Sequence, residues 1–174
     1  MAYSHHLILE TERLWIRPLS YDQLLQYIQL DNSLEERLGL SPYSRTLPGE
    51  LKEALEQVIL PQAAAAGANL LYSTLWTIID KEKKVMVGDL CFKGAPNAEG
   101  EVEIGYGTYA DFQGRGFMTE AVGAIAQWAL GQPCVRVVLA ETDKDNTASH
   151  KTLSKNNFTV YRQVENMLWW RRDP

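Results

Sequence analysis

The amino-acid sequence predicts a mixed α/β fold (α+β) in which helices are layered on one central sheet. Segments rich in β-branched and aromatic residues alternate with segments in which apolar residues recur at helical spacing. A glycine-rich turn also separates a regular strand segment from the most regular helix segment. No repeat, low-complexity linker or change of composition divides the chain, so residues 1–174 are expected to form a single domain.

Composition narrows the class of protein. The chain is 45% hydrophobic and 22% charged, with a net charge of −5, so it lacks the basic stripe of a nucleic-acid-binding protein. We see no secretory leader and no apolar run of membrane-spanning length, which predicts a cytoplasmic protein.

Cys91 and Cys134 lie in apolar runs and are expected to be buried free thiols. No metal-ligand spacing occurs, so no metal is expected.

The first third of the chain predicts one strand and two helices. Residues 14–19 resemble a strand closed by a proline. Ser20 is a good N-cap for the helix that follows. Residues 31–48 are less regular, and Pro48 then suits the first turn of a second helix. Pro61 is expected to bend or break that helix.

Three strand segments follow in the middle of the chain. Residues 70–80 are rich in aromatic and β-branched residues, and residues 85–93 form the next strand after a charged turn. Gly88 within it is expected to mark a bulge. Residues 94–100 have the glycine, proline and asparagine of a loop, and residues 101–109 form the third strand.

The last third predicts two helices and three strands. Residues 117–130 carry apolar side chains on one helical face and end before a glycine and a proline. Residues 135–140 are almost wholly apolar, as in a strand covered on both faces. A second helix is expected over residues 147–156, and short strands around Thr159 and at residues 168–170.

The turn between strand 101–109 and helix 117–130 is the strongest functional signal. Gly114 and Gly116 allow the backbone to approach an anion closely. The free N–H groups of the first helical turn point at such an anion, and the helix dipole favours negative charge there. The turn is therefore predicted to bind phosphate.

With its flanking segments, this turn resembles the acetyl-CoA-binding core of the GNAT superfamily of N-acetyltransferases. The family pattern Gln/Arg-x-x-Gly-x-Gly/Ala is met from Gln113 onward, except that Met118 replaces the small last residue. The family's Lys-x-Gly-Phe is replaced by Lys155-Asn156-Asn157-Phe158, where Asn157 is expected to adopt the left-handed conformation of the missing glycine. The other matching segments are Thr11-Glu12-Arg13-Leu14-Trp15-Ile16-Arg17, Glu103-Ile104-Gly105-Tyr106, Thr119-Glu120-Ala121 and Asn146-Thr147-Ala148-Ser149. Together they resemble the branch that contains the ribosomal-protein N-terminal acetyltransferases.

The resemblance implies a mostly antiparallel, mixed sheet of six to seven strands, with helices on both faces and a splay between the family's fourth and fifth strands. It implies acetyl-CoA as co-substrate and direct transfer of its acetyl group to a primary amine, on a protein N-terminus or a small molecule. The residues that it assigns to cofactor binding are Gly107, Thr108, Tyr109, Gln113, Gly114, Arg115, Gly116, Phe117, Met118, Thr119, Asn146 and Lys151.

Some of these residues have a second interpretation. The Arg115 side chain either adds a charge at the phosphates or points into solvent. Lys151 either reaches a phosphate of CoA or is a solvated lysine on a helix. Asn146 either contacts the pantetheine amides or only caps a helix. Gly105 and Gly107 require the same twisted or bulged backbone whether or not a ligand lies beside them.

Two residues are candidates for proton transfer. An amine acceptor must lose a proton before it attacks, and Glu103 is expected to be the base, directly or through water. Glu101 shares its strand face, and Asp89 is a less favoured substitute. Ser149 is expected to protonate the leaving thiolate. Otherwise Glu103 is a structural glutamate, and Ser149 bonds only to backbone in the first turn of a helix.

Two other functions compete with acetyl transfer. The changed residues Met118 and Asn157 leave room for a domain of this fold that binds CoA or a metabolite without turnover. A Rossmann-type dehydrogenase is disfavoured because no Gly-x-Gly-x-x-Gly follows the first strand. The amine acceptor is left open, as is the choice between monomer and homodimer; no nucleic-acid or membrane partner is expected.

Overall fold

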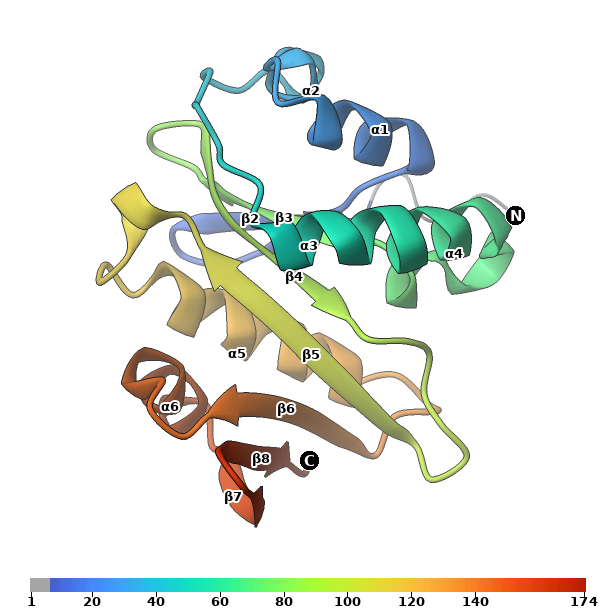
Figure 1. The fold of residues 1–174 in the computed structure, drawn as a ribbon, viewed down its shortest axis with the longest axis vertical. Helices are drawn as coiled ribbons and strands as arrows, with labels where there is room; N and C mark the ends of the chain where they lie inside the picture. The colour runs from blue at the N-terminus through green and yellow to red at the C-terminus, as the bar shows by residue number, and fades with distance from the viewer. Residues whose placement is uncertain (1–6) are drawn as a thin grey trace.

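An eight-stranded sheet runs through the centre of the molecule (Figure 1). The structure is a computed structural model, and it describes residues 7–174. The strands lie in the order β1-β2-β3-β4-β5-β6-β8-β7, and only β5 and β6 pair in parallel. Their bounds are β1 Leu9–Glu10, β2 Leu14–Pro18, β3 Leu75–Asp80, β4 Val85–Phe92, β5 Glu101–Thr108, β6 Val137–Asp143, β7 Thr159–Val164 and β8 Met167–Arg172.

Helical segments cover both faces of this sheet. Helix α5 lies behind β5 in Figure 1 with α6 beside it, while α3 and α4 cross in front of the sheet and α1 and α2 lie at its upper end. The α-helices are α1 Tyr21–Gln29, α2 Ser33–Leu38, α3 Gly49–Ala54, α4 Leu60–Ala65, α5 Phe117–Leu130 and α6 Thr147–Lys155. Shorter segments are the π-helical η1 Leu55–Ile59 and the 3₁₀ segments η2 Gly67–Tyr72 and η3 Ala110–Phe112.

The sheet splits between β5 and β6. Residues 101–104 of β5 pair with residues 137–140 of β6. Beyond this point, residues 105–108 pair only with β4 on the other side, and residues 141–143 pair only with β8. The two strands therefore diverge, and one edge of β5 is left without a backbone partner. This is the expected splay, in a sheet that is mostly antiparallel as predicted.

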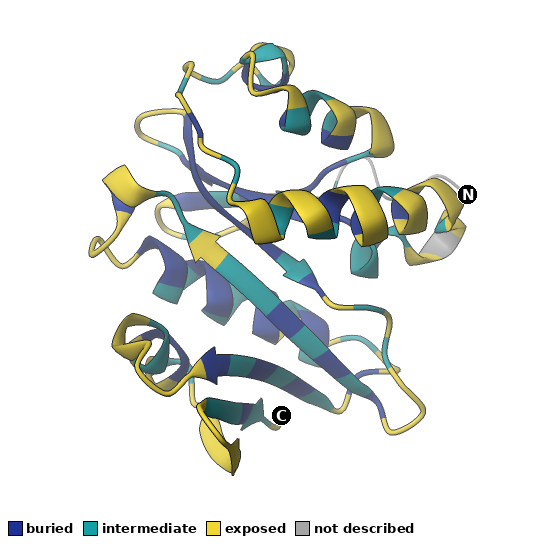
Figure 2. Ribbon diagram, in the orientation of Figure 1, coloured by how far each residue is buried: buried dark blue, intermediate teal, exposed yellow. Residues whose placement is uncertain are grey.

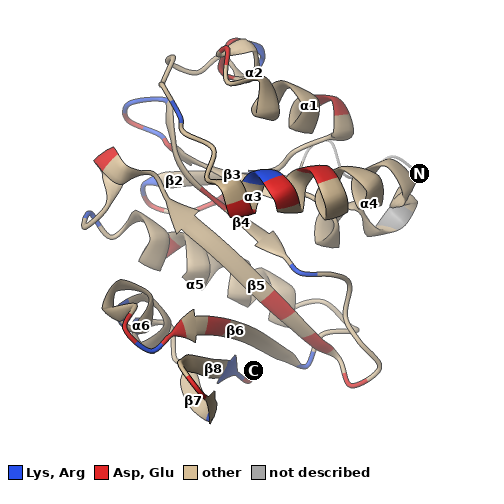
Figure 3. Ribbon diagram, viewed as in Figure 1, with Lys and Arg blue, Asp and Glu red and all other residues tan. Residues whose placement is uncertain are grey.

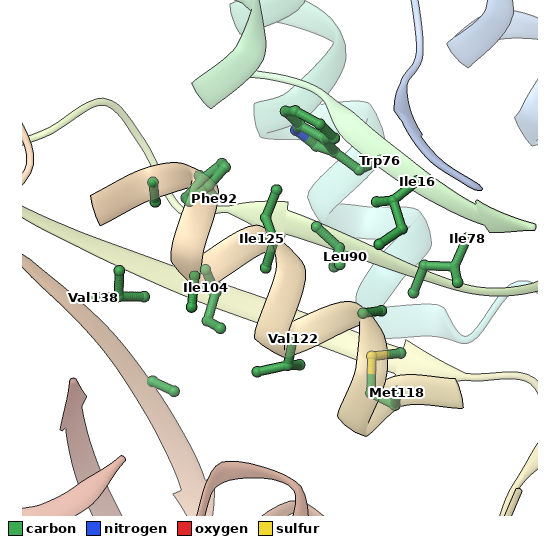
Figure 4. Packing of buried hydrophobic residues seen from close by; sticks show 14 of the residues in the cluster. Ile16, Trp76, Ile78, Leu90, Phe92, Ile104, Met118, Val122, Ile125 and Val138 are labelled. Carbon is green, nitrogen blue, oxygen red and sulfur yellow. The ribbon is translucent and has the colours of Figure 1, made fainter. Parts of the chain in front are cut away.

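Two hydrophobic clusters sandwich the sheet. Behind it, α5 packs Ala121, Val122 and Ile125 against the inward residues of β2 to β6, as Figure 4 shows. In front, α1, α2, η1 and α4 bury a second set of side chains that includes Leu24 and Leu55. The burial colours of Figure 2 follow this arrangement: α5 is mostly buried, whereas α3 and β7 are largely exposed. The alternation of strand side chains thus gives the sheet two apolar faces.

Several local predictions are confirmed. Ser20 and Gln23 form a reciprocal capping box at the start of α1. Asn157 adopts a φ of 63°, the left-handed conformation that its glycine-like position requires. The β3–β4 pairing shifts register so that Val87, next to Gly88, is an extra residue, which is the expected bulge.

Other predictions are wrong in detail. The sheet has eight strands rather than six or seven, because the two-residue β1 was not expected. Residues 70–72 belong to the 3₁₀ segment η2, and β3 starts only at Leu75. The irregular stretch 31–48 contains the short helix α2. Pro61 does not break its helix, because the wide π turn of η1 carries the chain past the proline, which lacks an N–H group.

The cysteines are only partly as expected. Both thiols are free, but Cys134 is exposed in the turn before β6 rather than buried in a strand, and Cys91 is half-buried on β4. Burial raises the pKa of the Cys91 thiol, which makes this residue a small hydrophobe rather than a reactive group.

Within residues 7–174, no helix is both long and apolar enough to cross a membrane. The same residues bring together no group of three or more potential metal-ligating side chains.

Candidate functional site

A cavity of about 730 Å³ opens where β5 and β6 diverge. Its size is typical of a pocket for a small molecule. The end of β5, the turn that follows, the first turn of α5 and the N-terminal part of α6 form its wall. All but two of the residues expected to bind the cofactor line it, and so does Ser149. They are Gly107, Thr108, Gln113, Gly114, Gly116, Phe117, Met118, Thr119, Asn146 and Lys151.

The glycine turn has the backbone shape that an anion site requires. Gly114 and Gly116 both lie in the left-handed region, with φ of 73° and 78°. Gly116 is the N-cap of α5, so the first N–H groups of this 14-residue helix have no partner within the helix. These groups and the helix dipole favour negative charge in the cavity beside them.

Met118 does not block the turn. Its side chain is 8% exposed and points away from the cavity wall into the core behind the sheet, as Figure 4 shows. Gly88 on β4 leaves space beside it, since a Cβ atom there would lie 2.6 Å from the Gly107 carbonyl oxygen and 3.3 Å from Met118 Cε. The larger Met118 side chain therefore packs in the core, and its backbone keeps its place at the start of α5.

The connection between β1 and β2, residues 11–13, braces the turn. The Arg13 guanidinium forms an ion pair with Glu120 in the first turn of α5 (Nε to Oε2, 2.7 Å), and it donates a hydrogen bond to the Arg115 carbonyl. Thr11 also donates to Glu120. Burial opposes ionisation of Glu120, but the hydrogen bonds from Thr11 and Arg13 lower its pKa. The segment around Arg13 and the glycine turn both carry the family resemblance, and these contacts explain why the two occur together.

Two residues that were expected at the cofactor lie outside the cavity wall. Arg115 is exposed, and its guanidinium lies over the Phe112 ring, 5.5 Å from the ring centroid. Tyr109 turns toward the front of the sheet, where its hydroxyl donates to Asp89 and its ring stacks on Tyr43.

The N-terminus of α6 forms the opposite wall. Asn146 caps the helix by accepting a hydrogen bond from the Ser149 backbone N–H (3.1 Å). The Tyr106 hydroxyl is buried near the Ser149 side chain but meets hydrogen-bond geometry with none of the described residues. Burial raises the pKa of Tyr106, with Ser149 opposing the effect. Lys151 and Lys155 add positive charge to this wall, which suits a phosphate-bearing ligand.

Glu103 lies on the front face, outside the cavity wall. Its carboxylate forms an ion pair with Lys93 (Oε1 to Nζ, 2.5 Å), and Lys93 also approaches Glu141 of β6 at 3.8 Å. Figure 3 marks the acidic positions along β5 and β6. Glu103 must give up this ion pair, or use its second oxygen, to take a proton from an acceptor.

A second carboxylate is buried on the same face. Asp89 of β4 is 5% exposed and pairs across the ladder with Gly107 of β5. Its Oδ2 accepts hydrogen bonds from Tyr27 (2.5 Å) and Tyr109 (2.9 Å). Its Oδ1 has no partner among the described residues. Burial raises the pKa of Asp89 to about 6, against the lowering effect of the two hydrogen bonds and of the Arg45 charge.

Sequence reasoning missed several of these positions. Glu141 at the splay is on β6, beyond the predicted end of that strand at residue 140. The Tyr27 hydroxyl reaches Asp89 from a helix 62 residues away, which no local pattern signals. Further residues of the cavity wall that were not predicted are Tyr106, Phe112, Thr147, Ala148, Thr152 and Lys155. Most of them directly adjoin predicted residues on β5 and α6, and this proximity was the available signal.

The chain resembles known acetyltransferases over nearly its whole length. Residues 13–159 match the family model described as an acetyltransferase (GNAT) domain. The Bacillus subtilis protein YjdG, described as an uncharacterized N-acetyltransferase, is 25% identical over 167 residues, which cover 94% of this chain and 96% of that protein.

Solved structures share the fold. A RimL ribosomal L7/L12 α-N-protein acetyltransferase in complex with coenzyme A superposes with a TM-score of 0.67 at 21% identity, over 96% of this chain and 98% of that one. A ribosomal-protein-S5-alanine acetyltransferase from Vibrio fischeri gives a TM-score of 0.67 at 16% identity, over 96% of each chain.

Proposed function

The chain belongs to the GNAT acetyltransferase family, whose acetyl donor is acetyl-CoA, and we propose that this protein transfers the acetyl group to a primary amine by direct attack on the thioester. The amine is carried by a protein N-terminus or a small molecule. Within the described residues, no cysteine lies beside a histidine in the cavity wall, so the proposal needs no covalent acetyl-enzyme.

One observation carries the proposal: the glycine turn, the unpaired edge of β5 and the α6 wall enclose one cavity. The turn offers backbone N–H groups to the pyrophosphate of CoA. The open edge of residues 105–108 offers backbone donors and acceptors to the two amides of the pantetheine arm, as a sheet edge does to an added strand. Lys151 and Lys155 supply charge for phosphate groups. These groups match the phosphates and the pantetheine arm of CoA, which supports the proposal.

The amine is proposed to approach from the front face, where acidic residues favour a cation. Glu103 and Glu141 flank the splay there, with Lys93 between them. Ser149 lines the cavity and is proposed to return a proton to the leaving thiolate, as the resemblance implies. In this arrangement Glu103 attracts the ammonium group to the open end of the splay, and a carboxylate on this face, Glu103 or a neighbour, takes its proton directly or through water.

The test is a turnover assay over a broad set of amines. The protein is mixed with acetyl-CoA and with N-terminal peptides, polyamines, amino acids or aminoglycosides, and released thiol is measured. We expect thiol release with at least one class of amine, and saturable acetyl-CoA binding in calorimetry. Failure to bind acetyl-CoA at millimolar concentration would contradict the proposal.

The same assay separates the alternative, a CoA-binding module without turnover. Tight binding with no thiol release from any amine would favour that alternative. The two sequence features that left room for it are both accommodated, because Asn157 has the conformation of the missing glycine and Met118 packs into the core.

A further inference from the structure

The front face holds a buried carboxylate that the proposed function has not used. Asp89 lies one strand away from the cavity, directly opposite Gly107, which is exposed and itself lines the cavity. A Cβ atom at Gly107 would meet nothing within 4 Å. Paired residues on one face of a sheet lie only about 5 Å apart, so no side chain of β5 separates Asp89 from the open space above the splay.

Two tyrosines hold this carboxylate by one oxygen only. Tyr27 of α1 and Tyr109 at the end of β5 both donate to Oδ2. The second oxygen, Oδ1, is buried and has no partner among the described residues. A buried carboxylate oxygen without a donor is costly and rarely retained without a function. An ammonium or amine N–H group is the donor that a substrate of this enzyme would bring.

From this geometry we propose that Asp89, positioned by Tyr27 and Tyr109, is the general base that takes the proton from the acceptor amine. This inference rests on the proposed acetyl transfer. Because Oδ1 is itself buried, the ammonium group of the acceptor gives one proton to it through one water molecule beside Gly107 and becomes a neutral nucleophile. Its nitrogen then forms the C–N bond as the C–S bond to CoA breaks. The thiolate takes up the second proton of the nitrogen through Ser149, and Asp89 releases its proton to solvent.

The surroundings of Asp89 suit this role. The charged and titratable groups around it are Tyr27 on α1, Glu35 on α2, Arg45 in the following loop, Cys91 on its own strand and Tyr109, while uncharged Thr77 faces it from β3. Arg45 forms an ion pair with Glu35 (2.9 Å), whose charge opposes the lowering effect of Arg45 on the pKa of Asp89. The pKa of Asp89, raised by burial to about 6, makes it a stronger base than an exposed aspartate and keeps it ionised at pH 7.

The test compares near-isosteric variants with the wild type across pH. In the wild type, kcat/KM with the best amine should decrease as the pH is lowered, and the midpoint of this acidic limb of the pH profile should lie near pH 6. Asp89→Asn should lose that limb and lower kcat/KM at pH 7 by about a hundredfold or more, with CoA affinity in calorimetry unchanged. Asp80→Asn is the matched control, because Asp80 is also a buried aspartate (6% exposed) but lies at the far end of β3; it should keep both rate and limb.

A third measurement needs no turnover. In the protein without acetyl-CoA, the ¹³C carboxyl resonance that disappears in Asp89→Asn should titrate near pH 6. Tyr109→Phe removes a hydrogen bond that lowers this pKa, so it should move both the resonance midpoint and the kinetic limb to higher pH. A purely structural aspartate would leave the kinetic limb in place.

The outcomes separate this inference from the proposed function. An Asp89→Asn enzyme with wild-type rate and limb would overturn the inference alone. So would loss of the limb in Glu103→Gln but not in Asp89→Asn, since the base would then be Glu103. A wild type that acetylates no amine would overturn the proposed function and this inference together.

Discussion

At the scale of single residues, the two departures from the family pattern have local explanations. Asn157 tolerates a φ of 63° because asparagine is the commonest non-glycine residue in that conformation. Met118 is accommodated because Gly88 on the neighbouring strand leaves room for its side chain. The first could be predicted from the residue type. The second could not, because it depends on two residues 30 positions apart that meet only in the folded sheet.

Asp89 makes a prediction about stability. Its pKa in the folded protein, about 6, lies above that of an unfolded aspartate, so the folded state binds its proton more tightly. The stability that this group contributes is present below about pH 4 and is lost as pH rises through 6. Relative to Asp89→Asn, the wild type should therefore lose roughly 2 to 3 kcal/mol of unfolding free energy between pH 4 and pH 7.

Urea denaturation of the two proteins at several pH values measures this difference. Other titrating groups are shared by both proteins and largely cancel. A difference in unfolding free energy that stays constant from pH 4 to pH 7 would mean that the Asp89 pKa is not raised.

At the scale of elements, the helix and strand segments with strong local signals were predicted well. Helix α5 begins and ends at the predicted residues, because Gly116 and Gly131 bound a clear apolar periodicity. Residues 70–72 at the end of the 3₁₀ segment η2 were predicted to begin a strand, because their aromatic and apolar side chains have no distinguishing period. The tertiary contacts of Tyr72 with Phe92 and Trp128 decide its position instead.

The contacts between the β1–β2 connection and the glycine turn make a prediction at this scale. Arg13→Ala removes the ion pair to Glu120 and the hydrogen bond to the Arg115 carbonyl, so the turn should become less ordered. We expect CoA to bind about tenfold more weakly in calorimetry, a loss of about 1.4 kcal/mol. The melting temperature should change little, because a half-exposed ion pair contributes under about 1 kcal/mol to stability.

Arg171→Ala is the matched control for this experiment. It removes another partly exposed ion pair, with Asp173, at the C-terminal end of the chain. That variant should bind CoA like the wild type. Equal affinities of Arg13→Ala and the wild type would show that the brace does not shape the turn.

At the scale of the whole molecule, the fold class and the cavity wall on the cofactor side followed from motifs that are local in sequence. The arrangement of residues on the front face did not follow from such motifs. Glu103 was expected to be the base from its motif alone, yet its partner Lys93 comes from the adjacent strand. The Asp89 cluster gathers residues from α1, α2, the α2–α3 loop, β4 and the position that follows β5. Such clusters depend on helix packing over the sheet, which a single sequence does not reveal.

The splay itself is also a property of the whole sheet. It arises because β5 is held by β4 along residues 104–108 while β6 follows β8 along residues 138–143. Neither strand alone shows where the pairing stops. The proposed function requires this gap to remain open and to accept the arm of the cofactor.

A crystal structure with bound CoA tests this arrangement most directly. We predict the pyrophosphate at the backbone N–H groups around Gly114 and Gly116, and the pantetheine arm alongside residues 105–108 with its sulfur directed to the front face near Gly107. CoA bound elsewhere on the protein, or β5 and β6 paired along their full length with no room for the arm, would contradict the account.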